Sequence, residues 1–423
     1  MTCTHPLRIR LEPVSTARVL AGLILLLPVS FAALEWMGIV NMGKLAVDAA
    51  WIGLGLIPVL KGRAYLRRDL LPLVIPVLTF LLGSLVVYLF RYQSGFYFLW
   101  GARNYLRFYV LFFGVACCFR VSDGIRCLNI LDRLFWPNFL LCLGQFFRGY
   151  RQDYLGGLFG VSRGCNGFLI IYFTLVITRS LLNCMQGKES LPLCLAKSGA
   201  ALAIAALSEL KFFFFLYLFL LAMATLLTPL SVRKLLMLSI GGILVFAAAW
   251  YLGRLYQGFR GFLSLDALRE MLSATGYATA DDLGRFSALT RISELFLKDP
   301  ISRLFGLGLG NCDNSSMALF RTPFYETYRE LHYTYFSHAF LFLETGYAGL
   351  GLYGSFFVLC FGKAMGKLRS GLGNPELCRM AVILAPVCLL LTVYNASLRT
   401  EAGYLLYFVL ALPFATEEVA SSV

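Results

Sequence analysis

The stretch LLPLVIPVLTFLLGSLVVYLF, residues 70–90, contains no charged side chain. An apolar run of about 18 residues or more is long enough to cross a bilayer as a helix. Because the run is continuous rather than alternating, it does not fit a strand of a membrane β-barrel. This stretch therefore predicts an all-α membrane protein.

Similar apolar runs follow one another along most of the 423 residues. The chain is 59% hydrophobic and only 14% charged, whereas soluble domains are about 25% charged, so soluble and disordered classes are excluded. One polytopic membrane domain over 1–423 is predicted, with about twelve transmembrane helices near 17–37, 45–60, 70–90, 104–119, 127–147, 167–185, 194–209, 211–228, 234–252, 336–361, 378–395 and 402–415. The break at 208–211 leaves two alternatives, a tight turn between two spans or one long broken helix.

Basic residues in alternate connections predict the orientation, since Lys and Arg are enriched on the cytoplasmic side. They include Arg18, Arg67, Arg120, Arg126, Arg233, Lys234, Lys367 and Arg369. Both termini are then cytoplasmic, and a large, partly helical loop at 253–335 is extracytoplasmic, before the last three spans. A cleaved leader is an alternative for the first span, because Ser30-Phe31-Ala32 resembles a cleavage site.

The loop at 253–335 is where water-side chemistry is expected. Apolar residues at helical spacing predict helices over 264–272 and 288–297, and Asp299-Pro300 predicts a stop. We interpret Asp281-Asp282 as the solvated start of a helix rather than as metal ligands. The pattern GLGLG at 306–310 follows no predicted strand, which favours a turn or a close approach of backbone to an anion over a nucleotide site.

Arginines are more numerous on the predicted outer face than orientation requires, which suggests an anionic ligand such as a phosphate or pyrophosphate. Arg151 and Arg163 flank the glycine-rich stretch 153–160, and others lie in the loop. The alternative is that single arginines snorkel to lipid headgroups. His332 and His338 are suited to proton transfer near neutral pH, although an interfacial structural role is the alternative for each.

Charged residues within or beside apolar runs are functional candidates by default. Lys211 and Glu344 are such residues, and Glu209 adjoins the same break as Lys211. For Arg399 and Glu401, which lie in the last outer turn, we expect a structural ion pair with each other.

Four stretches together resemble the Wzy-type polysaccharide polymerases and O-antigen ligases of bacterial envelopes. They are GRFSALTRISELFLKDPISRLFGLGLGN at 284–311, SHAFLFLETGYAGLGLY at 337–353, SELK at 208–211 and DYLGGLFG at 153–160. In the resemblance, Arg285 matches an arginine fifteen residues before the motif proline, His338 matches the histidine before the final spans, and Lys211 matches the cation of the split span.

The resemblance implies a metal-independent glycosyltransferase that polymerises undecaprenyl-pyrophosphate-linked repeat units on the outer face of the bacterial cytoplasmic membrane. His338 as base and Arg285 are then catalytic. Substrate-binding roles fall to Lys211, Arg291, Arg151, Asp153, Arg163, His332 and Glu344. No cofactor or metal is expected; the partners are the lipid-linked glycan, membrane lipid, and a chain-length regulator and flippase, without nucleic acid.

Two departures from the family pattern favour a polymerase over a ligase: Lys211 stands where arginine is usual, and Ala339 stands where ligases often have asparagine. A ligase that transfers a finished glycan to another acceptor is the alternative on the same scaffold. A flippase or other transporter is the alternative from another class, but it would more often show repeated halves.

Overall fold

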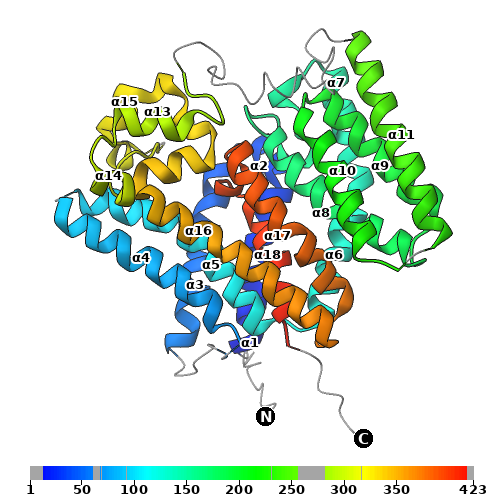
Figure 1. The fold of residues 1–423 in the computed structure, drawn as a ribbon, viewed down its shortest axis with the longest axis horizontal. Coiled ribbons are helices and arrows are strands. Elements are labelled where there is room, and N and C mark those ends of the chain that lie inside the picture. The colour runs from blue at the N-terminus through cyan, green and yellow to red at the C-terminus, as the bar shows by residue number, and fades with distance from the viewer. Residues whose placement is uncertain are drawn as a thin grey trace, which may run out of the picture.

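The computed structural model describes residues 13–60, 67, 69–91, 93–229, 231–255, 282–315 and 317–416. These residues form helices and one isolated bridge, between Arg120 and Thr416, so the all-α prediction is confirmed for them (Figure 1). The predicted helix at 264–272 and Asp281 lie outside the described residues. The helices are α1 (Pro13–Val29), α2 (Phe31–Trp36), α3 (Val40–Leu60), α4 (Leu71–Arg91), α5 (Gly95–Cys118), α6 (Val121–Arg133), α7 (Phe135–Phe147), α8 (Asn166–Met185), α9 (Leu191–Leu207), α10 (Lys211–Leu226), α11 (Val232–Leu255), α13 (Ala288–Leu295), α14 (Pro300–Phe305), α15 (Pro323–Tyr328), α16 (Ser337–Ser370), α17 (Pro375–Tyr394) and α18 (Gly403–Ala411), with short 3-10 turns such as η2 (Gly157–Phe159) and η5 (Arg329–Leu331) between them.

Each of the twelve predicted apolar segments lies on helix in the structure, although 17–37 is divided into α1 and α2 and 127–147 into α6 and α7. Within the described part of the chain, α4, α8, α16 and α17 are each long and apolar enough to cross a membrane. Several shorter helices, including α9, α10 and the region of α18, are also apolar.

The surface of α4 explains why its sequence has no polar face. Leu73, Val77 and Phe80 are buried against the rest of the protein, yet Ile75 and Leu82 on other sides of the helix are more than half exposed. A helix that is hydrophobic all round is typical of a protein core or a bilayer, and among the described residues no neighbour covers the outer side of α4. The exposed apolar side is therefore suited to contact with lipid.

The break at 208–211 is a tight turn between two helices rather than a single bent helix. The backbone N–H groups of Glu209 and Leu210 donate to the carbonyls of Ala206 and Ala205 at 3.2 and 2.8 Å, which is the paired bonding of a Schellman C-cap. This motif needs a left-handed residue, usually glycine, and Glu209 fills it with φ +54°. The turn thus places a strained acidic residue at the end of α9.

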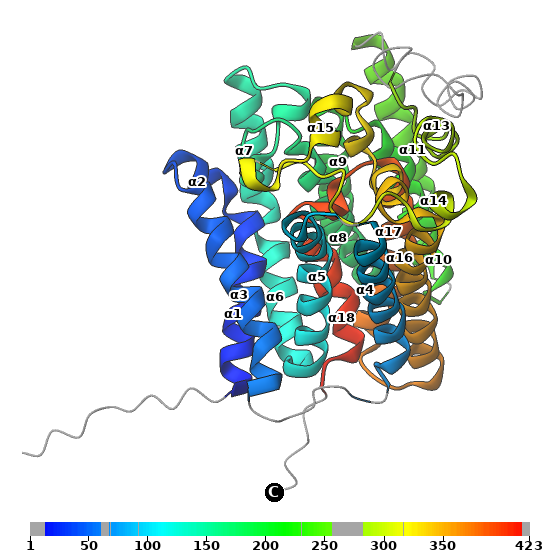
Figure 2. The same cartoon turned by 90° about the vertical axis from the view of Figure 1, so that its left-hand side faces the viewer.

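Three of the basic residues that the charge pattern assigns to one side lie at one end of the helix bundle. Arg67 donates to the carbonyl of Phe414 at 2.9 Å, and Lys367 donates to that of Pro413 at 2.9 Å. Arg18 pairs with Asp123 at 3.2 Å beside them. Figure 2 shows α13 and α15 at the opposite end, above the helices, while α1 begins at this basic end.

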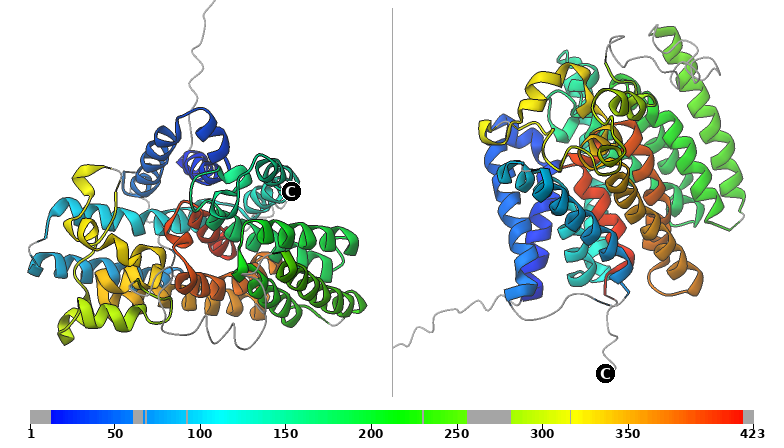
Figure 3. Two further views of the ribbon diagram at one scale, coloured as in Figure 1. Left: turned by 90° about the horizontal axis from the view of Figure 1, so that it is seen from above. Right: turned by 60° about the vertical axis from the view of Figure 1, so that its left-hand side comes forward.

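The polar segment, residues 282–315 and 317–336 before α16, has an apolar core of its own. This core is built against the first turns of α16. Leu283 and Ile292 from this segment pack with Tyr333, Phe340 and other fully buried residues. Seen from above, α17 and α18 lie between the group α8–α11 and the group that contains α4 and the polar segment (Figure 3). The segment is therefore continuous with the helix bundle and covers one end of it.

The glycines at 306–310 fasten the polar segment to a kink in α16. Gly346 has φ +65°, which interrupts the helix. The N–H groups of Leu307 and Gly308 donate to the carbonyls of Leu343 and Glu344, both at 2.9 Å. These are carbonyls that lose their helical partners at the kink. We call this contact the clasp. The N–H of Asn311 donates to the carbonyl of Gly308 at 3.1 Å, so a turn is present in the predicted stretch 306–310.

Candidate functional site

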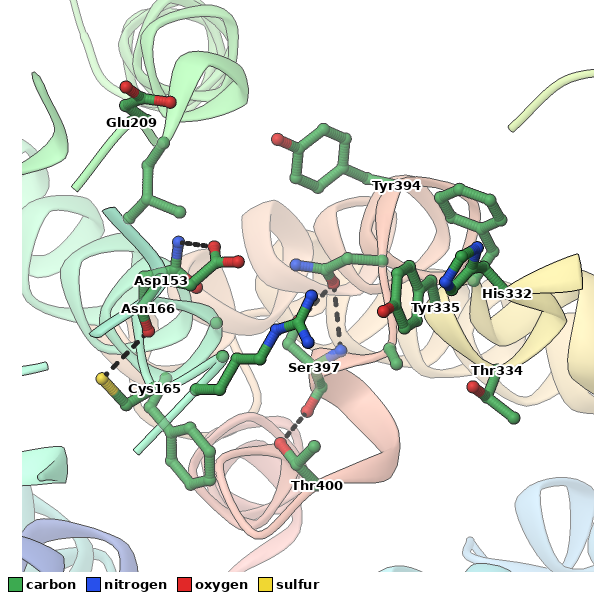
Figure 4. A pocket seen from close by; sticks show the side chains of 18 of the residues that line it. Asp153, Cys165, Asn166, Glu209, His332, Thr334, Tyr335, Tyr394, Ser397 and Thr400 are labelled. Atoms are coloured by element: carbon green, nitrogen blue, oxygen red, sulfur yellow. Dashed lines mark hydrogen bonds between the residues drawn. The ribbon is translucent and has the colours of Figure 1, made fainter. Parts of the chain in front are cut away.

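A cavity of about 550 Å³ opens where four separate parts of the chain meet. It is lined by residues from 153–168, by Glu209 and Leu210, by Arg285 with residues 332–336, and by residues 394–400. Figure 4 shows Asp153 and Glu209 on one side, with His332, Thr334 and Tyr335 on the other. Ligand sites in proteins are typically about 300–1,000 Å³, so the cavity can hold a ligand of a few sugar rings.

One wall of the cavity carries two carboxylates held by amide side chains. Asn166, at the start of α8, donates from Nδ2 to Oδ1 of Asp153 at 2.9 Å, and it also donates to the carbonyl of Ser208 at 3.2 Å. Gln152 donates from Nε2 to Oε1 of Glu209 at 2.8 Å. These bonds join the glycine-rich connection to the α9–α10 turn. They leave carboxylate oxygens on the cavity side that suit sugar hydroxyls as hydrogen-bond donors.

Backbone strain is concentrated around this cavity. Among the described residues, the non-glycine residues with left-handed φ are Gln152, Glu209 and His332, at +51°, +54° and +53°. Glu209 and His332 line the cavity, and Gln152 holds Glu209. Such conformations cost on the order of 1–3 kcal/mol each and cluster at functional sites. Three strained positions from three segments around one cavity support its assignment as the functional site.

The facing wall carries the cation Arg285, which the family resemblance singles out. Its Nε donates to the carbonyl of Tyr394 at 3.2 Å, and its guanidinium lies 4.8 Å from the centre of the Tyr394 ring. A second aromatic ring, that of Phe336, lies 5.5 Å away. Arg163, on the exposed connection before α8, also lines the cavity. Two predicted arginines from distant parts of the chain therefore reach the same space.

His332 lines the cavity and lies next to Asp282, which the sequence had predicted to be solvated. Asp282 is fully buried rather than solvated, and its Oδ2 lies 3.4 Å from Nδ1 of His332. The N–H of Leu283 donates to the carbonyl of Leu331 at 3.1 Å. This backbone bond brings the residue before Leu283 beside the residue after Leu331, a long-range pairing that no local pattern indicates.

His338 lies behind this wall and does not line the cavity. It is buried at the start of α16, with Nε2 2.8 Å from the carbonyl oxygen of Arg285 and Nδ1 3.3 Å from that of Thr392. Both ring nitrogens therefore face backbone carbonyl oxygens rather than the cavity. The predicted role of His338 as a base stays a prediction; the observed contacts fix the backbone of Arg285.

Two further predicted substrate-binding residues stabilise the polypeptide backbone near the cavity without lining it. Arg291, on α13, donates from Nη1 to the carbonyl of Asp282 at 2.8 Å. Arg151 is exposed and donates to the carbonyls of Phe146 and Tyr150, with its guanidinium over the ring of Phe146. Arg291 thus orders the residue that accompanies His332, whereas Arg151 completes the end of α7.

Lys211 and Glu344, the remaining predicted binding residues, also lie outside the lining of this cavity. Lys211 begins α10, next to Glu209 and Leu210, which do line it. Glu344 is fully buried at the kink of α16, and its Oε1 accepts from the N–H of Cys312 at 3.1 Å. It borders a smaller cavity of about 170 Å³ between α4 and the clasp.

The connection between α17 and α18 forms a wall of the cavity that was not predicted from the sequence. Asn395 and Ser397 line it, and Oδ1 of Asn395 accepts from Ser397 Oγ at 2.6 Å. The expected pair of Arg399 with Glu401 is wrong: Glu401 pairs with Arg107 at 3.3 Å, and Arg399 faces Asp313 at 3.8 Å. The only sequence feature that could have indicated this cavity wall was the polar stretch NASLRTE at 395–401.

The chain matches no family model and no curated protein sequence. Among the described residues, no group of three or more His, Cys, Asp and Glu side chains lies close enough to hold a metal ion. The arrangement of the cavity therefore carries the functional argument. Arg285 and His332 lie on one wall and face Asp153 and Glu209 on the other, while Arg163 comes from the same connection as Asp153.

Proposed function

We propose that this protein is a glycosyltransferase of the polysaccharide polymerase type, which joins undecaprenyl-pyrophosphate-linked repeat units on the outer face of a bacterial cytoplasmic membrane. The observation that carries the proposal is the single cavity shared by Arg163, Arg285, His332, Asp153 and Glu209. These residues come from the stretches that resemble the Wzy-type polymerases and O-antigen ligases, or lie beside them. Their convergence supports a common role for stretches that lie far apart in the sequence.

The proposed membrane arrangement has about twelve spans, with both termini cytoplasmic. Four helices in the described residues have the length and composition of membrane spans, and the outer side of α4 is apolar. Basic residues such as Arg67 and Lys367 lie at the end of the bundle opposite the polar segment. By the positive-inside rule that end is cytoplasmic, which puts the cavity on the outer side.

In the proposed reaction the arginines bind the pyrophosphate of the lipid-linked donor. A guanidinium is always charged and presents several N–H groups to phosphate oxygens, so Arg285 and Arg163 stabilise the charge that develops as the pyrophosphate leaves. Asp153 and Glu209 hold sugar hydroxyls and align the acceptor. The activated donor supplies the free energy, and the reaction proposed needs a proton acceptor but no nucleotide.

The test is elongation by the purified full-length protein in liposomes that carry lipid-linked repeat unit on the outer face. The polymerase proposal predicts lengthened lipid-linked glycan from the parent protein. Arg285→Ala is expected to lose at least ~100-fold in rate, as is typical when a donor to developing charge is removed. Arg329→Ala is the matched control, because Arg329 is an exposed arginine of the same segment that pairs with Glu330.

Product analysis separates the alternatives. A single transfer of glycan to an unrelated acceptor would identify a ligase, and movement of intact repeat unit across the bilayer without elongation would identify a transporter. Absence of elongation by well-folded parent protein, supplied with donor and acceptor on the outer face, would refute the polymerase proposal. A chain-length regulator and a flippase remain proposed partners, and added regulator is expected to narrow the length distribution.

A further inference from the structure

We infer that His332, oriented by the buried carboxylate of Asp282, is the group that takes the proton from the acceptor hydroxyl. This inference rests on the proposed glycosyl transfer and names the base within the same cavity. It moves the predicted role of base from His338 to His332. Three features carry it: the access of each imidazole to the cavity, the partner of each ring nitrogen, and the way in which His332 is held.

Access to the cavity differs between the two histidines. His332 lines the cavity and its side chain is 26% exposed, whereas His338 is buried and does not line it. A general base must lie within hydrogen-bond reach of the proton that it removes. His332 meets this requirement for an acceptor sugar bound in the cavity.

The ring nitrogens of the two histidines also differ in what they face. Nδ1 of His332 is buried and faces Oδ2 of Asp282 at 3.4 Å without a formed hydrogen bond, and Nε2 has no hydrogen-bond partner among the described residues. A buried carboxylate beside Nδ1 favours the tautomer with its proton on Nδ1, which leaves Nε2 as a proton acceptor. The distance is slightly longer than a hydrogen bond, and contacts of this kind often tighten only when substrate is bound.

The imidazole of His332 is held on several sides. The left-handed backbone at His332, φ +53°, turns its side chain at the end of η5. The ring of Tyr335 lies 4.7 Å from the imidazole, centre to centre. Asp282 is ordered in turn by the bond from Arg291 to its carbonyl. A strained backbone kept in place by these contacts is consistent with a side chain fixed for one geometry.

The acceptor oxygen forms a bond to the anomeric carbon of the donor sugar, and the bond from that carbon to the phosphate oxygen breaks, with its electron pair leaving on the lipid pyrophosphate. The hydroxyl proton moves to Nε2 of His332, and the resulting imidazolium is stabilised by the carboxylate of Asp282. The imidazolium then releases its proton to water. Asp282 is a positioning residue, because it acts through His332.

His338 is then a positioning residue for Arg285. Its Nε2 lies 2.8 Å from the carbonyl oxygen of Arg285, whose guanidinium reaches the cavity. Loss of the imidazole is expected to loosen that arginine and weaken binding of the donor pyrophosphate. The two histidines therefore predict different kinetic effects: loss of His332 lowers turnover alone, whereas loss of His338 acts through Arg285 and also raises KM for the donor.

A spectroscopic test of the pair formed by His332 and Asp282 needs no enzymatic activity. The chain has three histidines, so ¹⁵N-histidine NMR of the full-length protein in lipid nanodiscs gives few signals, and His332→Gln assigns one set. We expect the neutral His332 ring to carry its proton on Nδ1, and Asp282→Asn to shift it toward Nε2. Glu330→Gln is the matched control, since Glu330 is an exposed acid two residues from His332. A parent protein with its proton on Nε2 of His332 would overturn the inference.

The kinetic test uses the liposome elongation assay. His332→Gln and Asp282→Asn are expected to lower kcat by at least ~100-fold, with KM for the lipid-linked donor changed by less than about threefold. The double variant should lose little more than the worse single variant, because the two residues act as a unit. His338→Gln should raise KM. A kcat for His332→Gln within threefold of the parent would overturn the base assignment. If the parent protein itself elongates nothing, the polymerase proposal fails, while the NMR result still decides the dyad.

Discussion

The clasp between the polar segment and α16 makes a prediction that does not depend on function. Gly306 has φ +74°, and a methyl group added to it would lie 2.3 Å from the carbonyl carbon of Glu344 and 2.4 Å from the backbone nitrogen of Thr345. Both neighbours are backbone atoms that cannot rotate away. Gly306→Ala must therefore move the segment or distort the kink.

The expected cost of Gly306→Ala combines two effects. A left-handed conformation costs an L-residue about 1–2 kcal/mol, and overpacking a tight site costs about 1–3 kcal/mol. Together they predict a loss of ~2–5 kcal/mol in the free energy of unfolding. A shift of the segment also lengthens the two 2.9 Å bonds from Leu307 and Gly308 to α16.

The assay is unfolding of the purified protein in mixed micelles by increasing SDS, followed by tryptophan fluorescence. Gly351→Ala is the matched control, because Gly351 lies on α16, the helix that Gly306 contacts, and a methyl group there would meet nothing within 4 Å. Alanine is a better helix former than glycine, so this control should be neutral or stabilising by up to ~1 kcal/mol. If Gly306→Ala changed the free energy of unfolding no more than Gly351→Ala, the close packing described for the clasp would be refuted.

Further predictions concern how two buried acids, Asp313 and Glu401, affect the free energy of unfolding in the same assay. Burial raises the pKa of Asp313, against the opposing charge of Arg399; its stabilising contribution is therefore present below the ordinary carboxyl pKa of about 4 and is lost as the pH rises through the folded-state value. Asp313→Asn should flatten the fall in stability as the pH rises above about 4, and an unchanged slope would contradict this account. Glu401→Gln leaves the buried guanidinium of Arg107 without its charged partner, which lies 3.3 Å away, and is expected to cost about 3 kcal/mol or more. Glu326→Gln breaks an exposed pair with Arg321 at the same distance and should cost less than about 1 kcal/mol; equal losses from the two variants would show that burial does not set the cost.

The helices could be predicted from the sequence because each carries its own signal. The run at 70–90 has no charge, and its helix, α4, begins and ends within one residue of that run. Local signals were ambiguous only where two helices nearly meet. At 208–211 the sequence does not contain the glycine that usually marks a Schellman cap, and Glu209 takes its place.

The candidate site was predictable only in part, because its walls are joined by long-range contacts. The motifs correctly drew attention to Arg285, Asp153 and Arg163, which line one cavity. They gave no sign that Asp282 would be buried, since its burial depends on the backbone bond between Leu283 and Leu331. The part of the cavity formed by 394–400 resembles any polar turn between two helices, and only the packing of α17 and α18 brings it into place.

Long-range packing also determines that His332 rather than His338 reaches the cavity. The position of a histidine at the first turn of an apolar helix favours a catalytic role. Its ring must nevertheless lie against the part of the protein that covers that turn. Here the cover is the backbone of Arg285 and the end of α17, so both nitrogens of His338 face carbonyl oxygens. His332 lies on the covering segment itself, where a left-handed backbone turns it toward the space between the walls. The segment that fixes Arg285 in position therefore also supplies the histidine, and the last helices serve as the support against which both are held.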